Sequence, residues 1–168
     1  MPERKEPPRG PVVIESLPWV EFSKGVRYAA RTRFLSDTRE TTTRIGIGIE
    51  ELPPGKQSCP FHYHLLEEEH VIVLEGAMTL RLGDDELPLK AGDYACFPAG
   101  RREAHCFVNT GSESCRYIII GDNNPNEVCI YPDSNKVMIS GFGRKIIADG
   151  EQRDYWDGER ADEPLSKT

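Results

Sequence analysis

The sequence lacks a long apolar run and a basic tract, and each absence excludes a class of protein. Its 168 residues contain no stretch of about 18 apolar residues, so we expect no transmembrane helix. Residues 1–10 are charged and proline-rich with no apolar segment behind them, so we expect no secretory signal peptide. The 21 basic residues are outnumbered by 28 acidic ones, which gives a formal net charge of −7. This balance predicts no nucleic-acid partner and no membrane partner.

Paired cysteines are also missing. The five cysteines form no CxxC motif and are odd in number, which argues against a disulfide framework. Four of them lie in apolar, strand-like runs, where a reduced cysteine packs as a small hydrophobic residue. Cys59 differs because it stands three residues before His62, where it either lines a pocket or fills the core. Reduced thiols favour a cytoplasmic location.

Helical periodicity is almost absent, and short β-rich runs recur every eight to twelve residues between Gly, Pro, Asp and Asn. This rhythm predicts an all-β sandwich or barrel. We expect an N-terminal arm at 1–20, one β-barrel at 21–148 and a C-terminal tail at 149–168. The expected strands are 26–34, 42–52, 61–64, 70–74, 78–82, 86–89, 93–97, 105–109, 116–120, 127–131 and 137–139.

Three of the four histidines belong to one arrangement with a carboxylate. His62 and His64 are two residues apart, and side chains at this spacing in a strand share a face. Glu69 follows after a short bend, and His105 comes from a strand about forty residues later. Three neutral imidazoles and one carboxylate suit a borderline divalent ion such as iron, manganese, nickel, copper or zinc. His70 adjoins Glu69 and is expected on the opposite face.

The residues around the histidine pair resemble the first motif of the cupin superfamily, G(X)5HXH(X)3–4E(X)6G. The match runs through Gly55, His62, His64, Glu69 and Gly76, with only the first glycine displaced by one residue. The six-residue spacing to Gly76 selects Glu69 over Glu67 and Glu68 as the acidic residue of the motif.

The second cupin motif, G(X)5PXG(X)2H(X)3N, is matched with a longer loop. The match runs through Gly92, Pro98, Gly100, His105 and Asn109. The gap from glycine to histidine has four residues instead of two, which places Glu103 where the strict pattern has histidine. We choose His105 because the spacing from histidine to asparagine is intact.

This resemblance implies a double-stranded β-helix, the jelly-roll barrel of the cupins. It also implies a homodimer and one divalent metal ion (Zn, Ni, Mn or Fe) on His62, His64, Glu69 and His105. Six further segments resemble a subgroup of single-domain bacterial cupins, some of which are labelled sugar-phosphate isomerase-like. These segments are residues 52–55, 73–76, 91–93, 97–100, 131–136 and 154–159.

Four arginines are candidates for binding a small-molecule substrate. Arg31, Arg33 and Arg44 lie on strands before the first motif, where an inward guanidinium would bind a carboxylate or phosphate. Arg102 lies in the lengthened loop beside the expected metal strand, and loops at a barrel mouth often select ligands. For all four, an exposed and solvated side chain is the alternative.

The sequence leaves the activity open. One hypothesis is a metal-dependent enzyme, of dioxygenase, isomerase or lyase type, that acts on a small polar or anionic molecule. The alternative is a non-catalytic module or sensor that binds a small ligand or sugar and carries a structural metal. A metal-free epimerase that uses histidine and tyrosine is disfavoured by the four-residue ligand pattern. No residue is predicted to be catalytic.

Overall fold

A computed structural model describes residues 6, 9–37, 43–150 and 153–157 of the chain. Strands dominate these ranges, and the helical elements there are three single turns of 3₁₀ helix: η1 (Ile14–Ser16), η2 (Pro132–Ser134) and η3 (Ser140–Phe142). The predicted all-β class is therefore confirmed. None of the helices in these ranges is both long and apolar enough to cross a membrane.

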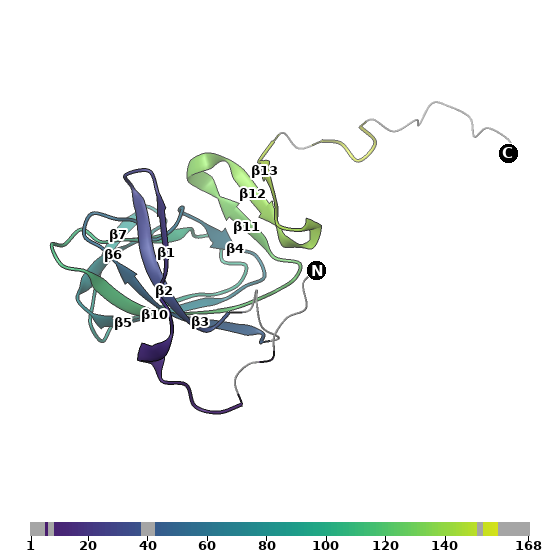
Figure 1. Ribbon diagram of the computed structural model, residues 1–168. Coiled ribbons are helices and arrows are strands. Elements are labelled where there is room, and N and C mark those ends of the chain that lie inside the picture. The colour runs from purple at the N-terminus through teal and green to yellow at the C-terminus, as the bar shows by residue number, and fades with distance from the viewer. Residues whose placement is uncertain (1–5, 7–8, 38–42, 151–152, 158–168) are drawn as a thin grey trace, which may run out of the picture.

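The strands form two layers. The first layer is a six-stranded antiparallel sheet with the order β1-β2-β3-β10-β5-β8 (Figure 1). Strand β10 pairs with β3 on one side and β5 on the other, so it lies inside the sheet. The bounds of the strands are β1 (Val20–Lys24), β2 (Tyr28–Ser36), β3 (Ile45–Leu52), β5 (Glu69–Glu75), β8 (Tyr94–Phe97) and β10 (Cys115–Asp122).

The second layer joins a three-stranded sheet, β7-β6-β9, to a four-stranded sheet, β13-β12-β11-β4. The segment that leads into β4 makes isolated bridges to β9, through Gln57 with Val108 and His62 with His105. The bounds are β4 (Tyr63–His64), β6 (Ala77–Leu82), β7 (Asp85–Lys90), β9 (His105–Val108), β11 (Val128–Tyr131), β12 (Lys136–Ile139) and β13 (Lys145–Ala148). Two facing antiparallel layers of this kind form the predicted jelly-roll barrel.

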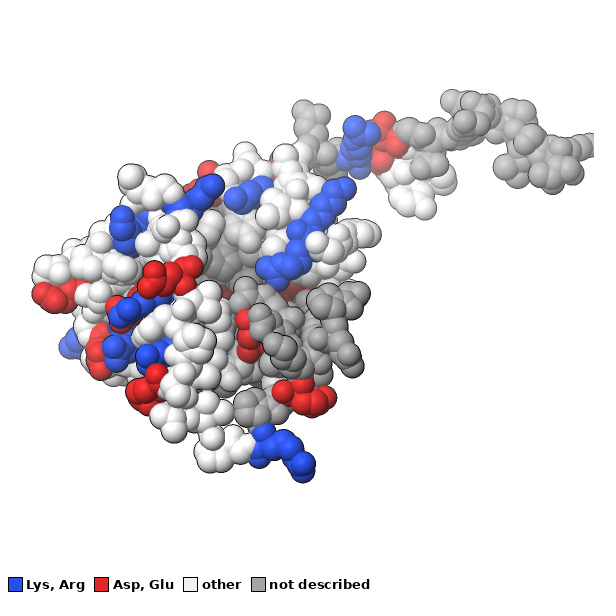
Figure 2. All heavy atoms as spheres, in the orientation of Figure 1, with Lys and Arg blue, Asp and Glu red and all other residues white. Residues whose placement is uncertain are grey.

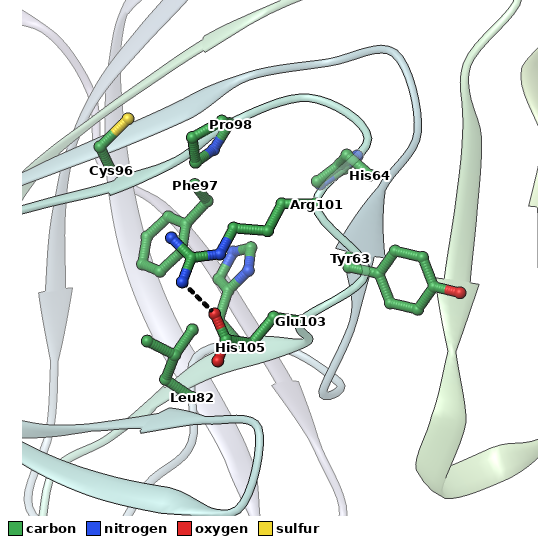
Figure 3. Close-up of a pocket in the computed structure, with 9 residues that line it drawn as sticks. All are labelled: Tyr63, His64, Leu82, Cys96, Phe97, Pro98, Arg101, Glu103 and His105. Atoms are coloured by element: carbon green, nitrogen blue, oxygen red, sulfur yellow. Dashed lines mark ion pairs between the residues drawn. The ribbon is translucent and has the colours of Figure 1, made fainter.

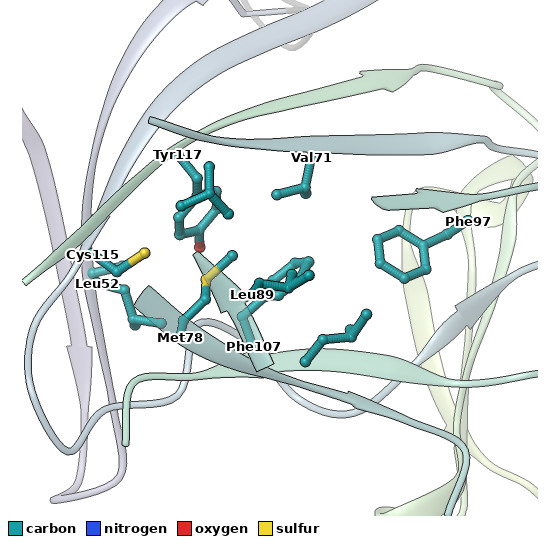
Figure 4. Packing of buried hydrophobic residues seen from close by; sticks show 11 residues of the cluster. Leu52, Val71, Met78, Leu89, Phe97, Phe107, Cys115 and Tyr117 are labelled. Carbon is teal, nitrogen blue, oxygen red and sulfur yellow. The ribbon is translucent and has the colours of Figure 1, made fainter. Parts of the chain in front are cut away.

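The core lies between the two layers (Figure 4). Its members come from both sheets because alternate residues of each strand point inward. Tyr117 of β10 and Leu52 of β3 are completely buried. The cluster comprises Ala30, Leu52, Val71, Val73, Met78, Leu80, Leu89, Phe97, Phe107, Cys115 and Tyr117. A second, smaller buried cluster consists of Phe61, Ala104 and Cys106.

Strands β1 and β13 have no counterpart in the sequence prediction. Each is the outermost strand of its sheet, and every residue in both is exposed. Edge strands of this kind carry no alternation of buried and exposed residues, so the sequence pattern gives no signal for them. The predicted start of the strand at 42–52 includes residue 42, which lies outside the described residues; the strand begins at Ile45.

Candidate metal centre

Three imidazoles meet where β4 and β9 approach each other. The backbone N–H of His62 donates to the carbonyl of His105 at 3.1 Å, and the N–H of His105 donates back at 2.7 Å. His64 follows two residues later. The ring centroid of His62 lies 4.8 Å from the centroid of His64 and 4.8 Å from that of His105. Phe97 stacks on His105 at 3.7 Å and restricts the orientation of its ring.

Glu69, the first residue of β5, brings a carboxylate to this cluster from the opposite layer. Its Oε2 atom lies 3.0 Å from Nε2 of His105, 3.5 Å from Nε2 of His64 and 3.8 Å from Nε2 of His62. Burial raises the pKa of Glu69, but the hydrogen bond with His105 and the nearby imidazole of His64 outweigh it and hold the pKa well below its usual range. Three imidazole nitrogens therefore converge on one anionic oxygen.

The other ring nitrogens show where the imidazole protons lie. Nδ1 of His62 is 2.8 Å from the carbonyl oxygen of Pro60, and Nδ1 of His64 is 3.3 Å from a carboxylate oxygen of Glu127. Because both partners only accept, each Nδ1 carries a proton and each Nε2 faces the cluster, with a lone pair for an ion whenever its ring is neutral. Nε2 of His64 is buried and makes no hydrogen bond. A divalent ion among these Nε2 atoms and Glu69 satisfies that nitrogen, so the donor set fits such an ion.

The electrostatics of the cluster also favour a cation. Burial lowers the pKa of His62 to about 4, so this imidazole is neutral at pH 7. Burial lowers the pKa of His64 too, but the hydrogen bond to Glu127 and the nearby carboxylate of Glu69 outweigh it and raise the pKa to about 10. The carboxylates around His64 therefore draw positive charge to this point of the barrel.

Glu127 is a site residue that the sequence analysis missed. It lies in the loop before β11 and is 0% exposed. Its Oε1 accepts the backbone N–H of Leu65, and its Oε2 accepts the N–H groups of Leu66 and Glu67. These contacts fix the turn between His64 and β5. No spacing or composition signal distinguishes this glutamate, because its role depends on a contact between distant segments.

A cavity of about 140 Å³ adjoins the cluster inside the barrel. His62, Glu69 and His105 form one wall, while Glu50 of β3 and Tyr117 of β10 also line it. Among the described residues that line this cavity, none is a lysine or arginine. The complete lining is Glu50, Ser58, Cys59, His62, Glu69, His105, Phe107, Tyr117 and Ile119.

A smaller pocket lies on the other side of His64 and His105 (Figure 3). Arg101 extends across it and makes a 2.7 Å ion pair with Glu103. The lengthened loop of the second motif therefore covers the histidines from this side. Glu103, the residue at the strict motif position for histidine, binds this arginine, while His105 contacts Glu69.

The four candidate substrate arginines do not line the cavity. Arg31 and Arg33 place their guanidinium groups 4.6 Å and 4.4 Å from the ring centroid of Trp19, and Arg31 also pairs with Glu51. Arg44 and Arg102 are exposed. On the described surface shown in Figure 2, basic and acidic side chains are interspersed, without an extended patch of one sign.

His70 points away from the cluster, as predicted, because adjacent residues of a strand face opposite sides and Glu69 faces the cluster. Its Nε2 lies 2.9 Å from a carboxylate oxygen of Glu68, and its Nδ1 lies 2.7 Å from the hydroxyl of Tyr94. The fourth histidine of the chain is therefore engaged elsewhere.

Comparisons with known proteins agree with this architecture. Residues 48–121 match the family described as "Cupin domain". A crystal structure described as a sugar phosphate isomerase from a cupin superfamily, from Silicibacter pomeroyi, is 26% identical, with a TM-score of 0.73. That similarity covers 87% of this chain and 98% of the other.

Two curated proteins match part of the chain. Polyketide synthase CurC of Streptomyces cyaneus is 33% identical over 72 residues, which are 43% of this chain and 45% of that protein. Protein SchB of Streptomyces halstedii is 33% identical over 84 residues, 50% of this chain and 59% of that protein. The chain thus spans about half the length of the curated relatives it matches.

Proposed function

The chain is a member of the cupin superfamily, and on that premise we propose that it is an enzyme dependent on a divalent metal held by His62, His64, Glu69 and His105. The observation that carries the proposal is the convergence of three Nε2 atoms on Oε2 of Glu69, at 3.0, 3.5 and 3.8 Å. Zinc, nickel, manganese and iron all accept this set of donors. When bound, the ion supplies a Lewis acid that polarises an oxygen of the substrate.

The cavity beside the ligands supports catalysis at a small polar group. Its volume of about 140 Å³ is far below the roughly 300–1,000 Å³ of sites that enclose a drug-sized ligand. The cavity therefore accommodates a small molecule or the reacting end of a larger one. A carboxyl group, Glu50, lines it in addition to the proposed ligands, which supports proton transfer to or from the substrate.

Isomerase chemistry agrees best with these features. The Silicibacter pomeroyi protein is described as a sugar phosphate isomerase, and isomerisation needs a positioned acid or base beside a polarised oxygen. Because the cavity is small and its described lining contains no lysine or arginine, we place the phosphate group of a sugar phosphate outside it.

Metal content of protein purified without added metal tests this proposal. We expect about one zinc, nickel, manganese or iron ion per chain, removable by a chelator and restored by titration. The single variants H62A, H64A and H105A should each lower the occupancy, while H70A should keep it. A chain that neither retains nor takes up any of these ions would refute the proposal.

A further inference from the structure

A pair of buried polar side chains lies in the cavity beside the proposed metal ligands. Glu50 comes from β3 and Tyr117 from β10, and the two residues are direct cross-strand partners. The Tyr117 hydroxyl donates a short hydrogen bond to Oε1 of Glu50, and the Thr32 hydroxyl donates to Oε2 at 3.1 Å. Neither Glu50 nor Tyr117 belongs to the proposed metal ligands, so the pair is free for another role.

Packing alone does not account for a carboxyl group at this position. Tyr117 is 0% exposed and belongs to the hydrophobic core, where an apolar partner would avoid the cost of burying a carboxylate. Burial raises the pKa of Glu50, and the hydrogen bonds from Tyr117 and Thr32 oppose this rise. Burial likewise holds the pKa of the Tyr117 phenol well above its usual range, so Tyr117 stays a donor.

We propose that Glu50 is the general base and acid of the site, that Tyr117 positions its carboxylate, and that the substrate presents a neutral α-hydroxy carbonyl group to the cavity. This inference rests on the proposed metal-dependent function. In the step, Glu50 removes a proton from the carbon beside the carbonyl. The C–H electron pair forms a C=C bond, and the carbonyl π electrons move to its oxygen. Glu50 then returns the proton to the adjoining carbon, whose new C–H bond takes the C=C electron pair. In the same isomerisation the substrate hydroxyl gives its O–H proton to the former carbonyl oxygen and its O–H electron pair forms the new carbonyl, so no oxidant or reductant is consumed.

The dimensions and charge of the cavity define the substrate class. A cavity of roughly 150 Å³ accommodates a molecule the size of benzene, and this one measures about 140 Å³. Its described lining has two carboxylates, Glu50 and Glu69, and no lysine or arginine, so only the proposed ion would offset an anionic group, which favours a neutral reacting end. A short, neutral hydroxy ketone fits both conditions.

Hydrogen–deuterium exchange into hydroxyacetone, a neutral α-hydroxy ketone smaller than benzene, tests this role without knowledge of the natural substrate. The zinc-loaded protein is incubated with hydroxyacetone in D₂O, and loss of the methylene signal is followed by proton NMR. We expect exchange that depends on the wild-type protein and falls at least about 100-fold in E50Q. The matched control is E51Q, because Glu51 pairs with Arg31 and does not line the cavity.

The variant Y117F separates positioning from proton transfer. Without the phenol hydrogen bond, which lowers the pKa of Glu50, the pH profile of exchange should move to higher pH. Glu69 and Cys59, the other titratable groups that interact with Glu50, are unchanged in this variant. Infrared spectra of metal-free protein provide a second readout. Wild type should show a protonated-carboxyl band at pH values above the range in which exposed glutamates titrate, and E50Q should lack this band.

The outcomes distinguish this inference from the proposed function. Zinc affinity, measured by calorimetry, should be the same in wild type, E50Q and E51Q. If zinc-loaded E50Q exchanges at the wild-type rate, or if zinc-loaded wild type shows no exchange above E50Q, the role of Glu50 is refuted and the metal site stands. If wild type binds no divalent ion, the proposed function itself fails.

Discussion

The variant E127Q perturbs the fold and the proposed metal site at one atom. Oε1 of Glu127 accepts hydrogen bonds from the N–H of Leu65 and from Nδ1 of His64, and Oε2 accepts the N–H groups of Leu66 and Glu67. Glutamine keeps the shape but can accept only through its oxygen, so two of the four donors lose their acceptor. A buried donor left unsatisfied costs about 1–3 kcal/mol, so the free energy of unfolding should fall by about 2–6 kcal/mol.

Metal affinity should fall in the same variant. The carboxylate fixes the tautomer and the ring orientation of His64, and removing such a partner typically lowers affinity about 10–100-fold. Urea denaturation measures the stability of metal-free protein, and titration calorimetry measures its affinity for zinc. The control is E75Q, because the carboxylate of Glu75 is 66% exposed and lies 3.4 Å from Arg116. It should change the stability by no more than about 0.5 kcal/mol and leave zinc affinity unchanged.

The pH dependence of the stability loss tests the cause. Burial raises the pKa of Glu127, but the hydrogen bond from His64 outweighs it, so the folded-state pKa lies below the ordinary value of 4.5. A carboxylate with a depressed pKa contributes stability that is complete above the unfolded-state pKa and lost as the pH falls through the folded-state pKa. The difference between wild type and E127Q should therefore shrink below about pH 4.5. Wild-type stability and zinc affinity in E127Q at pH 7 would refute the reasoning.

Three further predictions concern single residues. H105A should lose the bound ion, measured by elemental analysis, while H70A retains it; full occupancy in H105A would remove that residue from the ligand set. Gly76 has φ +76°, and a Cβ there would lie 2.8 Å from the backbone oxygen of Ser114, so G76A should cost about 2–4 kcal/mol in urea denaturation. Unchanged stability would contradict this. Native protein at pH 8 should show one thiol, Cys96, that reacts quickly with a chromogenic disulfide, and all five after unfolding. Burial raises the pKa of the other four, which are Cys59, Cys106, Cys115 and Cys129.

The sequence predicts those parts of the fold in which a strand buries apolar residues. In β9 and β10 apolar residues dominate, and both strands lie close to their expected ranges. Strands β1 and β13 escape prediction because they owe their existence to pairing with β2 and β12, and none of their side chains is buried. Backbone pairing of an exposed edge leaves no mark on the hydrophobic pattern.

The alternation of side chains between the two faces of a strand explains which site residues could be predicted from the sequence. The spacing of His62 and His64 places both on one face, and it required no knowledge of the topology. Arg31 and Arg33 share a face too, but the buried residue of that strand is Ala30, so the arginines take the opposite side. A shift of one residue exchanges the two faces of a strand. The expectation of inward arginines therefore depended on a register that only the folded sheet defines.

Three carboxylates lie around the histidines, and the hydrogen-bond partners of each show which of them best suits a metal ion. Glu127 receives three backbone N–H groups and one imidazole N–H, which use all of its acceptor positions. Glu50 receives two hydroxyl groups. Glu69 faces the Nε2 atoms of the three histidines, and the Nδ1 protons of His62 and His64 direct the other nitrogen of each ring toward it. A divalent ion at this point would replace the proton of His64 and offset the charge of the Glu69 carboxylate. Among these groups we therefore propose the ion at Glu69, in preference to the group formed by His64, Glu67 and Glu127.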